Sequence, residues 1–332
     1  MRKKTCYQLN DISAFKRNLL DWSKQFEEVV WLDTNDHKEK YGSFDIVLAV
    51  DALTALVTDA ENAFQNLREY QNETKDWIFG YLSYDLKNDV EELSSKNNDG
   101  LNFPDLYFFQ PKKIITISGD KVTFNYLNMV DEEIESDFKT ILELDSTDNN
   151  PESILEPIRI RMRIFKDEYF SKVNKMLAHI YRGDIYEANF CQEFYAEETE
   201  IDPFQTYQRL NRISKSPFAA FLKFGNSFLL SASPERYLKK VANKVISQPI
   251  KGTAPRSLNS AEDKSLISKL RKDEKERAEN IMIVDLVRND LSRTAAKGSV
   301  QVEELCGAYT FKQVHHLIST VITQVAEGHT PV

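Results

Sequence analysis

The chain has 332 residues, 41% of them hydrophobic, and a formal net charge of −9 at pH 7. This length exceeds the size at which one hydrophobic core usually stops growing, so we expect two lobes or one large composite domain. The acidic balance and the scattered basic residues argue against nucleic acid as a partner.

The N-terminus and the cysteines bear on where the chain resides. A polar stretch follows the basic start, Met1-Arg2-Lys3-Lys4, where a signal peptide would need an apolar core. No apolar run approaches the roughly 18 residues that a membrane span requires. The three cysteines are far apart and odd in number, which argues against both a disulfide framework and a zinc site. We therefore expect a cytoplasmic protein with no membrane partner.

In the first half of the chain, apolar residues at helical spacing predict a helix over residues 12–29. β-Branched and aromatic residues predict strands at 30–32, 46–50, 77–84, 114–117 and 122–124. The polar stretch 85–102 is predicted to be a loop. An acidic, turn-rich segment from Asp131 to Pro157 then indicates a lobe boundary. We accordingly expect an N-terminal lobe over residues 1–150 and a second region over 151–332.

In the second half, a helix is predicted over residues 166–182 and is closed by Gly183. The segment 186–194 is strand-like, and 218–224 with 227–231 reads as a hairpin around Gly225-Asn226. Helices are predicted over 260–290 and over roughly 311–325. Because runs of strands precede long helices, the pattern favours an α+β sandwich over an alternating parallel sheet.

Lys251 stands out in the run PIKGTAPR at 249–256, directly after the strand-type residues 245–247. A loop bounded by proline and glycine holds its backbone rigidly, so a lysine there can point into a cleft. Such a lysine acts as a nucleophile when its amine is neutral. The alternative interpretation is an ordinary solvated lysine.

Carboxylates form the second candidate group. Glu276 and Glu279 are three residues apart on a predicted helix and share a face, where they can offer oxygen ligands to Mg²⁺. Their neighbours are densely charged, so a solvated helix face is the alternative. Glu235, in the run SASPER, would by itself be interpreted as half of a surface ion pair with Arg236. Such a contact contributes little to stability.

Five segments match one known family in order. They are GDIYEANF at 183–190, SASPER at 231–236, PIKGTAPR at 249–256, ERAEN at 276–280 leading into DLVRNDL at 285–291, and VHHLIS at 314–319. Together they resemble the chorismate-utilising enzymes, a family that includes anthranilate synthase component I, aminodeoxychorismate synthase component I and the isochorismate synthases. The resemblance implies a two-lobed α/β sandwich of the anthranilate synthase component I type, with the chorismate-binding catalytic region in residues 151–332.

The resemblance also implies roles for individual residues. Glu279, with Glu276 beside it, corresponds to the glutamates that hold the Mg²⁺ bound by the substrate carboxylate. Glu235 corresponds to the acid that protonates the departing ring hydroxyl. Of the two adjacent histidines, His316 matches the family residue that lies near the ring carboxylate, and His315 is expected to be a surface or packing residue.

Two positions discriminate among family members. Anthranilate synthases usually carry a small residue at the position of Lys251, whereas many aminodeoxychorismate synthases carry lysine. At the position of Glu187 the isochorismate synthases place a water-activating lysine, and most amine-transferring members have glutamine. Glu187 departs from both patterns; we expect it, together with Thr253, to contact the substrate.

The resemblance therefore implies amination of chorismate to 4-amino-4-deoxychorismate for folate synthesis, through a covalent Lys251 intermediate. No Gly-x-Cys-x-Gly glutaminase motif is present in the sequence, so ammonia is expected from a separate glutamine amidotransferase chain. Anthranilate synthase component I is the alternative activity.

The family domain continues for about one further domain's worth of chain beyond the position of Val332. The continuation normally contains a glycine-rich loop, a substrate-clamping arginine and a second glutamate pair. We therefore expect the fold to be incomplete at the C-terminus, and a truncated, non-catalytic scaffold is a further alternative.

Overall fold

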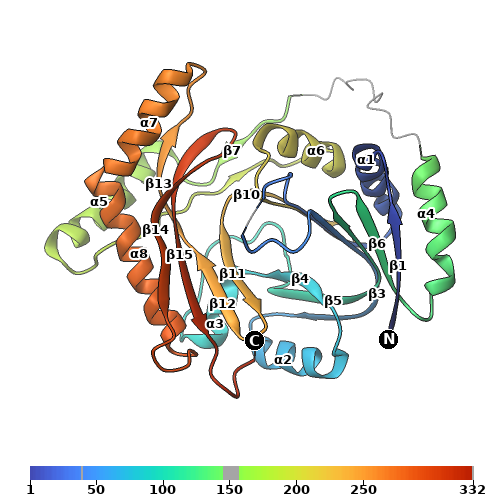
Figure 1. The fold of residues 1–332 in the computed structure, drawn as a ribbon. Coiled ribbons are helices and arrows are strands. Elements are labelled where there is room, and N and C mark those ends of the chain that lie inside the picture. The colour runs from blue at the N-terminus through green and yellow to red at the C-terminus, as the bar shows by residue number, and fades with distance from the viewer. Residues whose placement is uncertain (39, 145–156, 331–332) are drawn as a thin grey trace. The chain divides into compact units, whose positions relative to one another are not determined.

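The computed structural model describes residues 1–38, 40–144 and 157–330 (Figure 1). The chain divides into two compact units. The first comprises Met1–Ser146 with Pro203–Val332, and the second comprises Thr147–Asp202. No helix in the described residues is long and apolar enough to cross a bilayer.

The first unit contains an eight-stranded antiparallel sheet. Its strands, in spatial order, are β1 (Arg2–Gln8), β6 (Lys121–Leu127), β5 (Leu106–Ser118), β3 (Ile46–Thr58), β2 (Glu28–Asp33), β9 (Phe218–Phe224) and β10 (Ser227–Ser233), with β4 (Phe79–Leu82) paired to β5. β9 and β10 therefore extend a sheet that is otherwise built from the first half of the chain. Their hairpin turns at Gly225, whose φ of 58° suits glycine.

Helices cover both faces of this sheet. The larger core cluster joins α1 (Ile12–Trp22), α4 (Ile134–Glu143) and α6 (Pro203–Ser214) to the sheet, with Trp31, Phe124 and Phe221 fully buried between them (Figure 1). A smaller cluster holds α2 (Ala63–Thr74) against the opposite side of β5. The remaining short helices of this part are η1 (Ser23–Gln25), η2 (Tyr84–Leu86), α3 (Lys87–Val90) and η3 (Asp131–Glu133).

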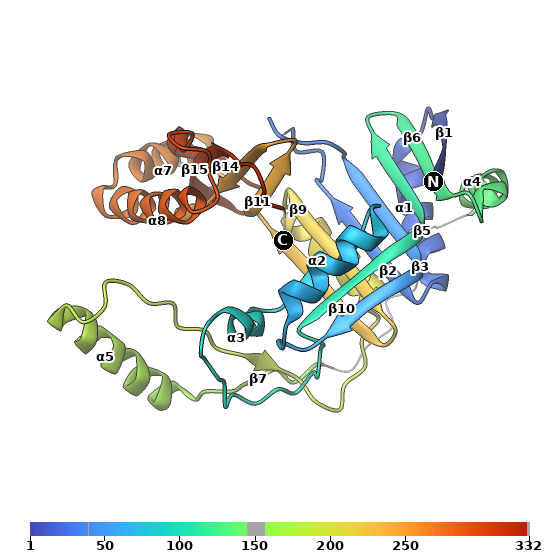
Figure 2. The ribbon, with the colours of Figure 1, turned by 90° about the horizontal axis from the view of Figure 1, so that it is seen from below.

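The second sheet of the first unit has five strands. They are β11 (Arg236–Val241), β12 (Lys244–Gln248), β15 (Val314–Gln324), β13 (Ile250–Pro255) and β14 (Gln301–Thr310). β15 pairs with three of them, β12, β13 and β14. Helices α7 (Ser260–Lys272) and α8 (Glu274–Ser292) lie side by side on one face of this sheet (Figure 2). Leu270 and Leu317 are buried between these helices and the sheet.

The second unit is small. It consists of α5 (Lys166–Arg182) and the two-residue strands β7 (Arg161–Met162) and β8 (Phe194–Tyr195). Gly183 ends α5 with a φ of 82° and donates its N–H to the carbonyl of Ile180. This is the C-terminal glycine cap that the sequence predicts.

Several predicted elements are confirmed, including the helix at 166–182, the hairpin at 218–231 and the strands near 30, 46 and 114. The helix predicted over 12–29 is too long, because α1 ends at Trp22 and β2 begins at Glu28. The segment 186–194 is irregular before it reaches β8. Residues 145–156 of the predicted boundary segment 131–157 lie outside the described residues, and the boundary itself stays a prediction.

Three errors concern the candidate site. The helix predicted over 311–325 is the strand β15, whose β-branched residues suit a pleated sheet better than a helix. The helix predicted over 260–290 is two helices, because Asp273 ends α7 and caps α8. Lys251, expected in a loop, lies within β13.

Candidate active site

Lys251 occupies a β-bulge. β13 pairs with β15 through Ile250 opposite Ile318 and Thr253 opposite His316, so Lys251 and Gly252 together face Leu317. A bulge bends its strand and re-aims the extra side chain, and bulges are frequent beside active sites. The half-buried side chain of Lys251 is therefore directed by an irregularity in the ladder and not by a flexible loop.

Gly252 makes this bulge possible. Its φ of 90° belongs to the left-handed region that favours glycine. A Cβ at this position would lie 3.1 Å from Cδ1 of Leu317 and 3.3 Å from Cβ of Glu276. The close approach brings the backbone beside Lys251 against the first turn of α8, which carries Glu276.

His316 lies directly across the ladder from Thr253. Its Nδ1 is 3.0 Å from Oγ1 of Thr253 and 3.4 Å from the carbonyl oxygen of Gly252. Burial lowers the pKa of His316, and this effect outweighs the opposing influence of the Gly252 carbonyl and of the Glu235 carboxylate. The imidazole is therefore neutral at pH 7.

His315 points to the opposite face, because neighbouring side chains alternate along a strand. It is buried, with Nε2 3.0 Å from Oδ1 of Asp263 and Nδ1 2.9 Å from Oγ1 of Thr310. The helical geometry that we expected for this pair is wrong. His315 is nevertheless a packing residue, and His316 alone lies beside Thr253.

Glu235 lies in the short link between β10 and β11 and contacts the same place. Its Oε1 accepts a hydrogen bond of 3.0 Å from the backbone N–H of Ile250, the residue before Lys251. Its charge also acts on His316. Arg236, the ion-pair partner considered from sequence, donates its Nε–H to Oε1 of Gln248 at 2.9 Å. The structure thus gathers Glu235, the Lys251 bulge and His316.

Glu276 and Glu279 are half-buried on the first turns of α8. The ammonium of Lys275 lies 3.7 Å from Oε1 of Glu276 and 3.3 Å from Oε1 of Glu279, so a single cation already interacts with both carboxylates. Across the described residues, no three His, Cys, Asp or Glu side chains converge as a metal site. Two carboxylates one turn apart suit Mg²⁺ that takes its other ligands from substrate and water.

Glu187 belongs to the second unit. It lies in the irregular segment that follows α5. The two units are described separately, so its expected contact with the substrate stays a prediction.

Sequence reasoning missed Asn280, which follows Glu279 on α8. It is 1% exposed and hydrogen-bonds the backbone at the Lys251 bulge. The available signal was its position four residues before the buried Val284, because polar residues on the buried face of a helix require partners.

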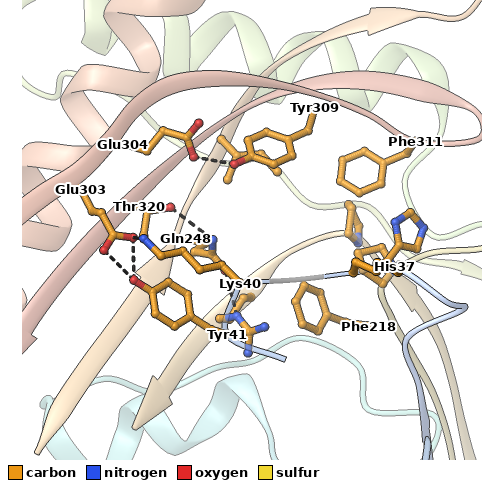
Figure 3. A pocket seen from close by; sticks show the side chains of 15 residues that line it. His37, Lys40, Tyr41, Phe218, Gln248, Glu303, Glu304, Tyr309, Phe311 and Thr320 are labelled. Carbon is orange, nitrogen blue, oxygen red and sulfur yellow. Dashed lines mark hydrogen bonds and ion pairs between the residues drawn. The ribbon is translucent and has the colours of Figure 1, made fainter. Parts of the chain in front are cut away.

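A cavity of about 480 Å³ opens beside the second sheet (Figure 3). Its aromatic wall includes Tyr41, Phe218 and Phe311, and the Phe311 ring lies 5.7 Å from that of His316. At its rim the Tyr41 hydroxyl donates to Glu303 at 2.6 Å, and Lys40 pairs with the same carboxylate at 2.9 Å. The volume is that of a small-molecule site, but none of the residues expected from sequence lines it.

A family model described as chorismate binding enzyme matches residues 22–332. The chain belongs to the chorismate-binding enzyme family. The resemblance drawn from the five motifs is thereby confirmed, and four of the motifs supply the residues around the Lys251 bulge.

Curated relatives carry names of two kinds, anthranilate synthase and aminodeoxychorismate synthase. An anthranilate synthase component I-like protein of Synechocystis is 34% identical over 261 residues, which cover 78% of this chain and 53% of that protein. Aminodeoxychorismate synthase component 1 of Salmonella typhimurium is 42% identical over 161 residues, covering 48% of this chain and 35% of that protein. The chain spans about half the length, or less, of these relatives.

The crystal structure of anthranilate synthase component I from Streptococcus pneumoniae has the same fold. It aligns with a TM-score of 0.73 at 24% identity, covering 89% of this chain and 73% of that one. The predicted fold type, a mixed α/β structure of the anthranilate synthase component I class, is confirmed.

Proposed function

We propose that the protein containing this chain aminates chorismate to 4-amino-4-deoxychorismate. The observation that carries the proposal is Lys251 itself, held in a bulge whose preceding residue is bonded to Glu235 and whose following residues contact His316. A lysine whose backbone lies beside a carboxyl group and a neutral imidazole suits nucleophilic displacement. The 42% identity to aminodeoxychorismate synthase component 1 over 161 residues also supports it.

In the proposed reaction, the neutral amine of Lys251 forms a bond to ring carbon 2. The electron pairs of the ring diene shift, and the bond from carbon 4 to its hydroxyl breaks as Glu235 transfers a proton to the departing oxygen. Ammonia then bonds to carbon 4, the electron pairs return, and the bond to Lys251 breaks, while the surplus proton of the new ammonium group returns to Glu235. Dividing the displacement into two steps restores the lysine and releases the 4-amino product with water.

The other residues position the substrate. Neutral His316 lies near the ring carboxylate, and Thr253 and Glu187 provide polar contacts. Glu276 and Glu279 would hold Mg²⁺, which would supply positive charge to neutralise a substrate carboxylate. Ammonia comes from a separate glutamine amidotransferase chain, and we place the reaction in cytoplasmic folate synthesis.

Anthranilate synthase component I is the second candidate. It is favoured by the longer alignment to the Synechocystis relative, 261 residues against 161. Both candidates use chorismate and ammonia, so product identity separates them.

The test incubates the full-length protein with chorismate, Mg²⁺ and an ammonium salt, and separates the products by chromatography. We expect 4-amino-4-deoxychorismate, together with a covalent adduct at Lys251 in the intact mass spectrum. Lys251→Ala should abolish both, whereas Lys264→Ala, at an exposed position on α7, should change neither. Anthranilate as the main product, or full activity in Lys251→Ala, would contradict the proposal.

A further inference from the structure

The bulge at Lys251 interrupts the hydrogen-bond ladder between β13 and β15. At the interruption, Nδ2 of Asn280 donates hydrogen bonds to the carbonyl oxygens of Lys251, at 3.2 Å, and of Leu317, at 3.1 Å. These carbonyls belong to the extra residue of the bulge and to the residue opposite it. One side-chain amide from α8 thus holds the two strands where their own pairing is irregular.

The other end of the Asn280 amide is equally occupied. Its Oδ1 accepts a hydrogen bond of 2.5 Å from the Ser319 hydroxyl and a longer one, 3.5 Å, from the Cys306 thiol. The Ser319 oxygen in turn accepts the backbone N–H of Cys306 at 2.8 Å. Cys306 lies in a second irregularity, between β14 and β15, and has a φ of 53°.

Asn280 therefore has partners at both ends of its amide, and both ends serve a bulge. The network is buried, since Asn280, Ser319 and Cys306 are 1%, 0% and 6% exposed. A fully paired polar network in a core rigidifies the elements that it joins. Here it joins α8 to the three strands β13, β14 and β15.

Asn280 also follows Glu279 directly in α8 and lies one turn after Glu276. The backbone of Lys251 is thus attached to the helix that carries both carboxylates. We propose that Asn280 is a positioning residue that fixes the Lys251 amine relative to Glu276 and Glu279. This inference rests on the proposed function, because it matters only if Lys251 is the nucleophile.

The chemistry of the side chain explains why asparagine is needed. Aspartate has the same shape but would present an acceptor oxygen to two carbonyl oxygens, which repels them. Alanine would leave both carbonyls without this donor. In either case the bulge becomes free to shift, and a misplacement of about 1 Å in a reacting group can lower a rate by about 100-fold.

The experiment compares Asn280→Asp and Asn280→Ala with two controls in the full-length protein. Ser319→Ala removes a partner of Oδ1 from the same buried network but keeps both bonds to the bulge carbonyls. Asn289→Asp makes the identical change at an exposed position on α8. Steady-state kinetics with chorismate, the rate of adduct formation at Lys251 and the melting temperature are measured for each.

We expect both Asn280 variants, assayed below their melting temperatures, to lose about 10- to 100-fold in kcat and in adduct formation with KM changed by less than about threefold. Ser319→Ala should lower the melting temperature but retain kcat, which separates positioning from stability. Asn280 variants with the kcat of Ser319→Ala would overturn the inference alone. An unaltered protein that forms no aminodeoxychorismate would overturn the proposed function, and the inference with it.

Discussion

The carboxylate of Asp273 accepts the backbone N–H of Glu276 at 3.0 Å, and so caps α8 at the residue where α7 ends. An N-terminal cap of this kind satisfies one of the helix donors that lack an internal partner. The cap also fixes the turn of α8 that carries Glu276. The break between the two helices is therefore part of how the carboxylate is placed.

Removing this cap should destabilise the protein moderately. We expect Asp273→Ala to lower the free energy of unfolding by about 0.5–2 kcal/mol, because the N–H of Glu276 loses its acceptor. Denaturant unfolding followed by circular dichroism measures the change. Asp273→Asn retains an oxygen acceptor and should stay close to the unaltered protein; an equally large loss in that variant would show that the charge and not the cap matters.

Gly252 provides a test of the bulge. Gly252→Ala would strain a residue with φ of 90° and press a methyl group against Leu317 and Glu276. Gly298→Ala is the matched control, since Gly298 has a φ of 74° but open space around it. Left-handed strain alone is expected to cost Gly298→Ala about 1–2 kcal/mol, and Gly252→Ala should cost more. Equal losses of unfolding free energy in the two variants, measured by thermal or denaturant unfolding, would show that the added methyl group is accommodated at the bulge at no extra cost.

Lys113 is a buried cation in the first sheet, and only 5% of its surface is exposed. Burial alone would lower its pKa, but hydrogen bonds from its ammonium to Asp137 and Glu133 raise it. We expect Lys113→Ala to cost about 3–5 kcal/mol, because Asp137 loses its charged partner. Lys112→Ala, which breaks the more exposed pair with Asp51, should cost no more than about 1 kcal/mol.

The pH dependence of stability should report on Asp263. Hydrogen bonds from Arg256, from the backbone N–H of Ser257 and from His315 hold the pKa of Asp263 well below its ordinary value of 3.8. The folded carboxylate thus binds fewer protons than the unfolded one, so its stabilising effect is present above pH 3.8 and is lost as the pH falls toward the folded pKa.

Asp263→Asn should therefore be less stable than the unaltered protein at neutral pH and show a shallower loss on acidification. Asp285→Asn is the control, since Asp285 pairs with Arg288 at an exposed part of α8. Urea unfolding across the acidic range measures both. Parallel curves for Asp263→Asn and the unaltered protein would exclude Asp263 as the titrating group.

The sequence was a better guide to which residues lie together in the candidate site than to the secondary structure of the segments that carry them. Glu235, Lys251, Thr253 and His316, which the motifs contain, lie together although they are spread over 82 positions of the sequence. Their backbone was harder to predict. The segment from Val314 to Gln324 is apolar enough to pass for a buried helix, and only its three pairing strands decide that it is a strand.

The bulge and its support were beyond prediction for a related reason. The register shift between β13 and β15 depends on how β15 pairs with strands that are distant in the sequence. No single residue indicates such a shift. Gly252 was visible as a glycine, yet its close approach to Glu276 arises only when α8 packs on the sheet. The reason for a buried asparagine at position 280 is likewise clear only from the positions of the Lys251 and Leu317 carbonyls, to which its side chain donates hydrogen bonds.

The irregular pairing of β15 also determines which of the two neighbouring histidines faces Thr253. A slip of β15 by one residue would turn His315 toward Thr253 and bury His316 beside Asp263, because strand side chains alternate. The bulges on both flanks of β15 oppose such a slip, since each fits only one alignment. Which imidazole faces Thr253 is therefore a property of strand alignment, and a mutation that shifts this alignment moves His316 away from Thr253 without changing the histidine itself.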